Sequence, residues 1–122
     1  MRKTNGEKYR ERLKELGFRN YKEYLASDIW KKQRTDFYKY RKTIHCQLCK
    51  KTYNLNVHHT RYSRLGKENF KKDLILLCRD CHYELHQFLK ENPKYWLHSA
   101  HRSLARKKRR EKQERFISRK II

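Results

Sequence analysis

The sequence predicts an α+β fold, in which a small ββα finger stapled by zinc is flanked by N-terminal helices and by a basic C-terminal helix. Three observations predict it. The cysteines form two Cys-x-x-Cys pairs, at 46–49 and 78–81. Two short strand-like stretches lie between these pairs: 54–58, in which apolar and polar residues alternate, and the apolar run 74–77. Apolar side chains at helical spacing and suitable cap residues predict helices before the finger, and residues 99–119 are expected to form one after it.

The N-terminal part predicts three helices. Residues 7–17 place apolar side chains on one helical face, and Gly17 suits a helix end. A short second helix is expected around residues 21–25. Ser27 suits the N-cap position of a longer helix over residues 28–41. The side chains expected on the buried side of this third helix are Ile29, Trp30, Phe37 and Tyr40.

The finger itself is predicted as two strands and a helix. Apolar and polar residues alternate over 54–58, which is the pattern of a half-buried strand. A long loop over residues 60–72 follows, and the apolar run at 74–77 leads into the second cysteine pair. A helix is expected to begin at Cys81 and to end before Pro93, because proline cannot continue a helix.

The C-terminal part predicts an apolar anchor at residues 95–97 and a helix over 99–119. This helix carries a run of five basic side chains, which is either a solvated tail or an arm that becomes ordered on DNA phosphates. The five residues are Arg106, Lys107, Lys108, Arg109 and Arg110. We therefore divide the chain into an N-terminal helical arm (1–43), a zinc-stabilised core (44–92) and a basic C-terminal helix or tail (93–122).

Charge predicts the class of partner. The 122 residues contain 34 Lys and Arg against 13 Asp and Glu, a formal net charge of +21. Such a balance favours nucleic acid as the partner, although it does not separate an enzyme from a packing protein. There is no long apolar run and no signal-peptide pattern behind the N-terminal Met-Arg-Lys. A cytoplasmic protein with no membrane partner and no small-molecule cofactor is expected.

The two cysteine pairs predict one structural Zn²⁺ site. Each Cys-x-x-Cys turn presents two thiolates to one ion, and four thiolates complete a tetrahedral shell. This spacing fits metal binding in a reducing compartment better than disulfides. A closed shell has no open position, so this ion cannot be the catalytic one. The predicted ligands are Cys46, Cys49, Cys78 and Cys81.

Four histidines form a second group of candidate ligands. His82 and His86 are four residues apart on the predicted helix, so both imidazoles lie on the same side. His58 and His59 are neighbours at a strand end, and adjacent strand residues face opposite ways. We therefore expect one ring of the doublet to bind a metal and the other to meet a substrate. A lone histidine is usually a polar surface residue, but this grouping favours a metal site.

These residues together resemble a known family. The combination Cys46-x-x-Cys49, Leu55-x-Val57-His58-His59, Asp73-Leu-Ile-Leu-Leu-Cys78-x-x-Cys81-His82 and His86 is similar to the HNH endonucleases, also called ββα-metal or His-Me finger nucleases. The variety that it resembles is the bacterial and phage type with two Cys-x-x-Cys knuckles. The resemblance extends over residues 20–90, because Tyr24-Leu25-x-Ser27-x-x-Trp30-x-x-x-Arg34 is similar to the helix that often precedes the first knuckle.

The resemblance implies a role for each matching residue. His59 would be the general base that takes a proton from water, an assignment that suits an imidazole. His58 and His82 would bind a catalytic divalent ion, with His86 as a third ligand used by some members. Asp73 stands where the family has the middle asparagine, and it can still accept hydrogen bonds and brace the loop. Imidazole ligands accept several ions, so Mg²⁺, Mn²⁺, Ni²⁺, Co²⁺ and Zn²⁺ all stay open.

The resemblance and the charge together predict a metal-dependent endonuclease that hydrolyses DNA phosphodiester bonds. Arg61 and Arg64 are expected to contact flanking phosphates, beside the basic run at 106–110. The alternative is a zinc-stabilised nucleic-acid binding module without chemistry, in which the histidines have no catalytic role.

Overall fold

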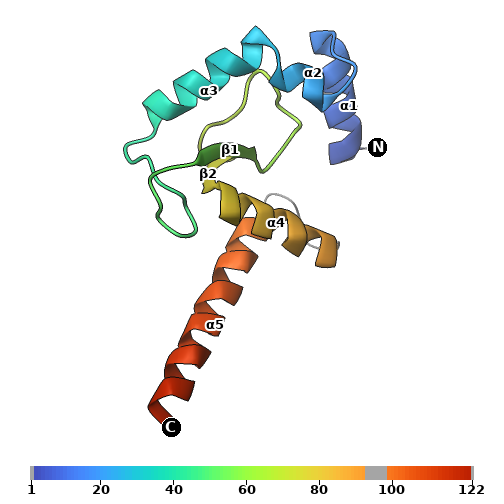
Figure 1. Cartoon of the computed structure of the whole chain (residues 1–122). Coiled ribbons are helices and arrows are strands. Elements are labelled where there is room, and N and C mark those ends of the chain that lie inside the picture. Colours follow the sequence, from blue (N-terminus) through green and yellow to red (C-terminus); the bar gives the residue numbers. More distant parts are fainter. Residues whose placement is uncertain (1, 93–98, 122) are drawn as a thin grey trace.

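The computed structural model describes residues 2–92 and 99–121, with the backbone alone from residue 116 onward. Figure 1 shows a small sheet at the centre, three helices on one side of it and two on the other, with the last helix extending away from the rest. This arrangement confirms the predicted α+β class. The elements in chain order are α1 (Asn5–Leu16), α2 (Tyr21–Leu25), α3 (Asp28–Tyr40), β1 (Leu55–His59), β2 (Leu74–Cys78), α4 (Arg79–Glu91) and α5 (Ala100–Ile121).

The N-terminal helices begin and end where local side chains satisfy the backbone. Thr4 and Glu7 form a capping box at the start of α1, and Gly17 ends it with φ 83°, a conformation that glycine adopts without strain. The Ser27 hydroxyl accepts a hydrogen bond from the Trp30 amide, which confirms the predicted cap of α3.

One expectation for α3 is wrong in part. Trp30 and Phe37 are buried, but Ile29 is 39% exposed and Tyr40 is 53% exposed. Residues 30 and 37 are seven apart and so share one helical face, whereas residues 29 and 40 lie to the side of it. The buried stripe of α3 is therefore narrower than the sequence predicts.

The sheet consists of β1 and β2, which pair antiparallel. Val57 lies opposite Leu76, His58 opposite Ile75, and His59 opposite Leu74. Because side chains alternate along a strand, His59 shares one face of the sheet with Leu74, and His58 shares the other face with Ile75. The strand register therefore places the side chains of His58 and His59 on opposite faces of the sheet, as predicted.

Each face of the sheet packs against its own apolar cluster. All five residues of β2 are buried, which is expected of a strand that is covered on both sides. One cluster lies on the His59 face and joins β2 to the N-terminal helices through Leu13, Tyr24, Trp30, Phe37, Leu65, Leu74 and Leu76. The other lies on the His58 face and joins β2 to the cysteines, α4 and α5 through Ile75, Leu77, Leu85, Phe88, Ala100 and Leu104.

The helix after the second cysteine pair begins earlier than predicted. It starts at Arg79 rather than at Cys81, because the Cys78 sulfur caps it by accepting a hydrogen bond from the Cys81 amide. α4 ends at Glu91, before the proline, as expected. The expected apolar anchor at 95–97 lies outside the described residues. No helix in the described part of the chain has the length and apolar character needed to cross a membrane.

Candidate functional site

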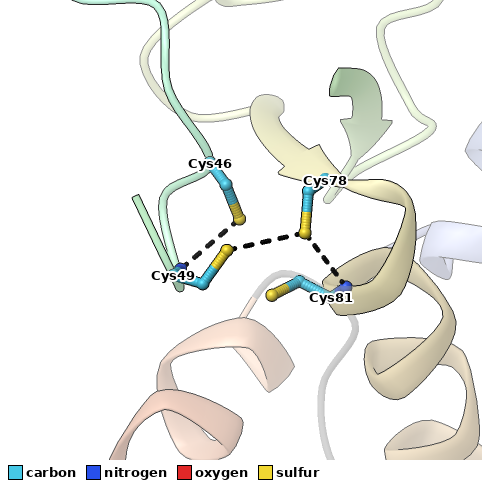
Figure 2. Close-up of side chains that lie close together, drawn as sticks. All are labelled: Cys46, Cys49, Cys78 and Cys81. Atoms are coloured by element: carbon cyan, nitrogen blue, oxygen red, sulfur yellow. Dashed lines mark hydrogen bonds between the residues drawn. The ribbon is translucent and has the colours of Figure 1, made fainter. Parts of the chain in front are cut away.

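The four cysteines converge on one point. Cys46 and Cys49 come from the loop that precedes β1, Cys78 ends β2, and Cys81 lies in the first turn of α4 (Figure 2). The four sulfur atoms all lie within 4.8 Å of one another. The chain thus places four thiols around a common centre at the junction of the knuckle, the sheet and α4.

Backbone amides lie close to two of these sulfurs and favour the thiolate of Cys46, whereas burial raises the pKa of Cys49 and of Cys81. The Cys49 amide lies 3.5 Å from the Cys46 sulfur, and the Cys81 amide lies 3.4 Å from the Cys78 sulfur. Burial alone would raise the pKa of Cys46, but hydrogen bonds from backbone N–H groups lower that pKa to about 6. All four are free thiols rather than disulfides. A set of four sulfurs with amide donors fits Zn²⁺, the ion expected for paired Cys-x-x-Cys turns.

Three histidines form a second centre on the His58 face of the sheet. Nδ1 of His58 lies 3.2 Å from Nε2 of His82, and Nε2 of His86 lies 2.9 Å from that same His82 nitrogen. One ring nitrogen from each of the three lies within 4.8 Å of the others. β1 supplies His58 and α4 supplies the other two, one helical turn apart, so the ββα arrangement itself brings them together.

The electrostatics of this centre favour metal binding over protonation. Burial, followed by the proximity of His82 and His86, lowers the pKa of His58 to about 3. Burial and then His86 also lower the pKa of His82. At neutral pH the lone pairs of these rings are therefore free to converge on a cation. Three imidazole nitrogens are a donor set that fits a divalent transition ion.

His59 lies on the other face and is buried, with an exposed fraction of 1%. Its Nδ1 lies 2.6 Å from the Tyr21 hydroxyl, and its Nε2 lies 2.7 Å from Oε2 of Glu68. The ring packs against Trp30, with centroids 4.6 Å apart, and stacks on Tyr62 at 5.6 Å. This imidazole is consequently fixed in orientation by polar groups at both nitrogens and by aromatic rings on its faces.

A cavity of about 600 Å³ brings the two histidine environments together. Its wall includes all four histidines of the predicted site, together with side chains of α2 and α3. The α2 and α3 residues relevant to the chemistry are Tyr21, Trp30 and Arg34. This volume is within the range of small-ligand sites, and residues from both faces of the sheet line it.

Asp73 anchors the loop that follows the doublet. Its buried carboxylate accepts hydrogen bonds from Nε and Nη2 of Arg64 and from the Asn69 amide, and its backbone oxygen accepts from the Thr60 amide. The loop over residues 60–72 is thereby tied at both ends next to His59. The guanidinium of Arg64, expected to contact DNA, is bound to Asp73 here, and its side chain is 41% exposed.

The other expected DNA contacts lie in the loop after β1 and on α5. Arg61 is exposed directly after β1. The basic run lies on α5, where Arg106, Arg109 and Arg110 are exposed. Lys108 differs from its neighbours, because its Nζ lies 2.7 Å from Glu84 of α4 and 3.8 Å from the Cys81 sulfur. Lys108 therefore joins α5 to the cysteine centre.

Sequence reasoning missed two residues that contact His59 directly, Tyr21 and Glu68. Glu68 follows Gly66 in the predicted loop, and nothing in its charge alone separates it from a solvated loop residue. Tyr21 is assigned to a short helix as an apolar side chain. A possible signal is the compact Gly66-x-Glu68 sequence after the doublet, since Gly66 takes φ 85° and its amide donates to Glu68 Oε1.

Comparison with protein-family models gives a match in the central part of the chain. Residues 46–88 match the model described as HNH endonuclease, a segment that includes both cysteine pairs, both strands and most of α4. Comparisons with curated proteins and with solved structures found no match. The family match confirms the resemblance that the cysteine and histidine spacing predicts.

Proposed function

We propose, on the premise that residues 46–88 are an HNH domain, that this protein is a metal-dependent endonuclease that hydrolyses phosphodiester bonds in DNA. The family supports nuclease chemistry in general. The observation that carries the finer proposal is the shared cavity, in which three convergent imidazoles meet a fourth that is held separately. A net charge of +21 supports a polyanionic substrate.

The four cysteines would hold a structural Zn²⁺, and His58, His82 and His86 would hold the catalytic ion. When bound, a divalent ion stabilises the negative charge that develops on the phosphate and on the leaving 3′ oxygen. His59 is the general base that takes a proton from the attacking water. General base catalysis of this kind raises the rate of a reaction by about 10²- to 10⁴-fold. Asp73 keeps the loop after β1 in place, so that the base holds its position beside the cavity.

Cleavage of supercoiled plasmid tests this proposal. We expect nicking with at least one of Mg²⁺, Mn²⁺, Ni²⁺ and Co²⁺, and a loss of at least about 100-fold in the His59→Gln protein. Glutamine is preferred to alanine because His59 is buried, so that alanine would leave a cavity. The side-chain amide of glutamine can still donate a hydrogen bond to Glu68. His58→Ala is expected to lose both cleavage and catalytic-metal binding. Thr52→Ala, an exposed change in the knuckle region, is the control.

One observation favours the alternative of a binding module without chemistry. Both ring nitrogens of His59 are already hydrogen-bonded to protein groups, whereas a base needs an accessible lone pair. This alternative predicts tight DNA binding and no nicking with any of the four ions. A folded His59→Gln protein that cleaves at the full rate would instead remove His59 as the base while leaving an enzyme.

A further inference from the structure

His59 is the middle member of a hydrogen-bonded chain that runs from α2 to the loop after β1. The Tyr21 hydroxyl lies 2.6 Å from Nδ1, and the Glu68 carboxylate lies 2.7 Å from Nε2. Both distances are at the short end of the range for hydrogen bonds. The two nitrogens of one imidazole are thus joined to two different side chains, from segments that are far apart in the sequence.

The surroundings of Glu68 determine the direction of these hydrogen bonds. Its Oε2 also accepts from the Tyr24 hydroxyl, and its Oε1 accepts from the Gly66 amide and the Gln33 amide group. A carboxylate that receives so many donors is ionised and accepts only. Nε2 of His59 therefore carries the proton that it donates to Glu68. In the neutral ring, Nδ1 has the free lone pair, and the Tyr21 hydroxyl donates to it.

The two ends of the chain differ in their access to the cavity. Tyr21 lines the cavity together with the three candidate metal ligands, while Glu68 is 6% exposed and lies outside the cavity wall. The lone pair of His59 consequently faces the cavity side, and the Tyr21 hydroxyl stands at that nitrogen. A hydroxyl has one donor and two acceptor lone pairs, so Tyr21 can donate to His59 and still accept a hydrogen bond from water.

We propose that Tyr21 is a catalytic residue whose hydroxyl passes a proton from the attacking water to Nδ1 of His59. This inference rests on the proposed function, in which His59 is the base. As the water oxygen forms its bond to phosphorus, one water O–H bond breaks and its proton binds to the Tyr21 oxygen. The original Tyr21 proton moves to Nδ1 in the same step.

The step balances without a further reactant. Tyr21 ends as the neutral hydroxyl that it was, and His59 becomes an imidazolium whose Nε2–H faces the Glu68 carboxylate. The bond from phosphorus to the 3′ oxygen breaks, and that oxygen leaves with the bonding electron pair and takes a proton from solvent. His59 afterwards releases its proton to solvent, and the sum is the hydrolysis of one phosphodiester by one water.

The first test is single-turnover cleavage by Tyr21→Phe, which keeps the ring and removes the hydroxyl. We expect the cleavage rate to fall about 100-fold, while DNA affinity, metal affinity and the circular dichroism spectrum stay the same. Tyr9→Phe is the matched control, because its ring packs on Tyr62 in the same aromatic cluster and does not contact His59. Cleavage by Tyr21→Phe at the wild-type rate or faster would overturn the relay.

The second test needs no variant that might misfold. In mixtures of H₂O and D₂O, a two-proton relay makes the single-turnover rate of the wild type curve downward with the deuterium fraction, whereas direct transfer of one proton gives a straight line. A straight line for the wild type would overturn the relay. Full cleavage by His59→Gln would overturn the proposed base and the relay with it, while inactive His59→Gln beside fully active Tyr21→Phe would overturn the relay alone.

Discussion

Glu68 is the buried carboxylate at which α2, α3 and the loop after β1 meet. It joins Tyr24, Gln33 and His59 through one side chain that is almost completely inaccessible to solvent. Burial alone would raise the pKa of Glu68, but the hydrogen bonds from His59 and Tyr24 lower it below its ordinary value of 4.5. The folded protein therefore prefers the ionised carboxylate.

This preference predicts an acid-sensitive contribution to stability. Because the unfolded chain takes up a proton on Glu68 at a higher pH than the folded protein does, the contribution is present above about pH 4.5 and is lost as the pH falls further. Glu68→Gln cannot titrate. We expect it to be less stable than the wild type at neutral pH, and the difference in melting temperature to narrow below about pH 4.5.

Thermal unfolding of both proteins across this range measures the effect. Acid would also release an ion held by the thiolates, but it would do so in both proteins, so the difference between them isolates Glu68. A difference that stays constant from neutral pH down through the titration of Glu68 would contradict the assignment. Glu114→Gln, at an exposed position of α5, controls for the loss of a carboxylate in general.

Among the elements, α5 joins two different environments. Its first turns pack on the cluster beside the cysteines through Ala100 and Leu104, and Lys108 pairs with Glu84 of α4. Beyond that point the helix extends away from the rest of the molecule (Figure 1). Arg106, Arg109 and Arg110 are exposed near this transition, whereas Lys108 pairs with α4.

The replacement of Arg106, Arg109 and Arg110 by glutamine tests α5 as a DNA arm. Each phosphate contact that is lost lowers the slope of log affinity against log salt by about 0.9 on duplex DNA, so three contacts lower it by about 2.7. Lys108 is left intact, because removing it would also disturb α4 and the cysteine centre. Fluorescence anisotropy of a labelled duplex over a salt series gives the slope.

A matched control is available at the opposite end of the molecule. Arg19 lies between α1 and α2 and pairs with Glu23, so Arg19→Gln removes one positive charge without altering α5. We expect its salt slope to stay within one unit of the wild type. An unchanged slope in the triple variant would mean that α5 is not in contact with the duplex.

In the molecule as a whole, the cysteine centre lies at one end of β2, the strand on which both apolar clusters depend. Cys78 belongs to the strand and Cys81 to the helix that follows it. Because one ion held by the four thiols would tie the cysteine loop, β2 and α4 together, we expect the order of this segment to depend on it. Structural zinc contributes about 10–16 kcal/mol in zinc-finger peptides, which is as large as the stability of a typical domain.

Removal of zinc is therefore expected to unfold residues 44–90 as a unit. The measurement is hydrogen exchange in the presence of a strong chelator, with readdition of Zn²⁺ as the control for reversibility. We expect amide protection to be lost throughout β1, β2 and α4 and to return with the ion. Protection that persists in the chelated protein would contradict this dependence.

Much of this fold follows from local sequence signals. The strand boundaries, the cap at Ser27 and the convergence of His58, His82 and His86 are encoded by spacing, because alternation and helical periodicity determine which side chains share a face. The helices differ from expectation by only a few residues, as at α4, where the Cys78 sulfur acts as an unforeseen cap.

The environment of His59 does not follow from such signals. Tyr21 and Glu68 are 38 and 9 residues from it in the sequence and meet it only once the N-terminal helices pack on the sheet. Periodicity reports which face a residue occupies but not which distant polar group it meets. Arg64 shows the same limit, because its pairing with Asp73 depends on the folded loop. Its role in DNA contact, like the division of the chain at residues 43 and 92, stays a prediction.

The burial of β2 on both faces bears on how this finger can be reused. If residues 44–92 alone were transferred into another protein, Leu74 and Leu76 would lose the N-terminal helices that bury them. The exposed leucines would then promote aggregation. A workable chimera must bring along Tyr24, Trp30 and Phe37, or a substitute of equal shape from its new host. The helical arm therefore has to accompany the finger in any such transfer.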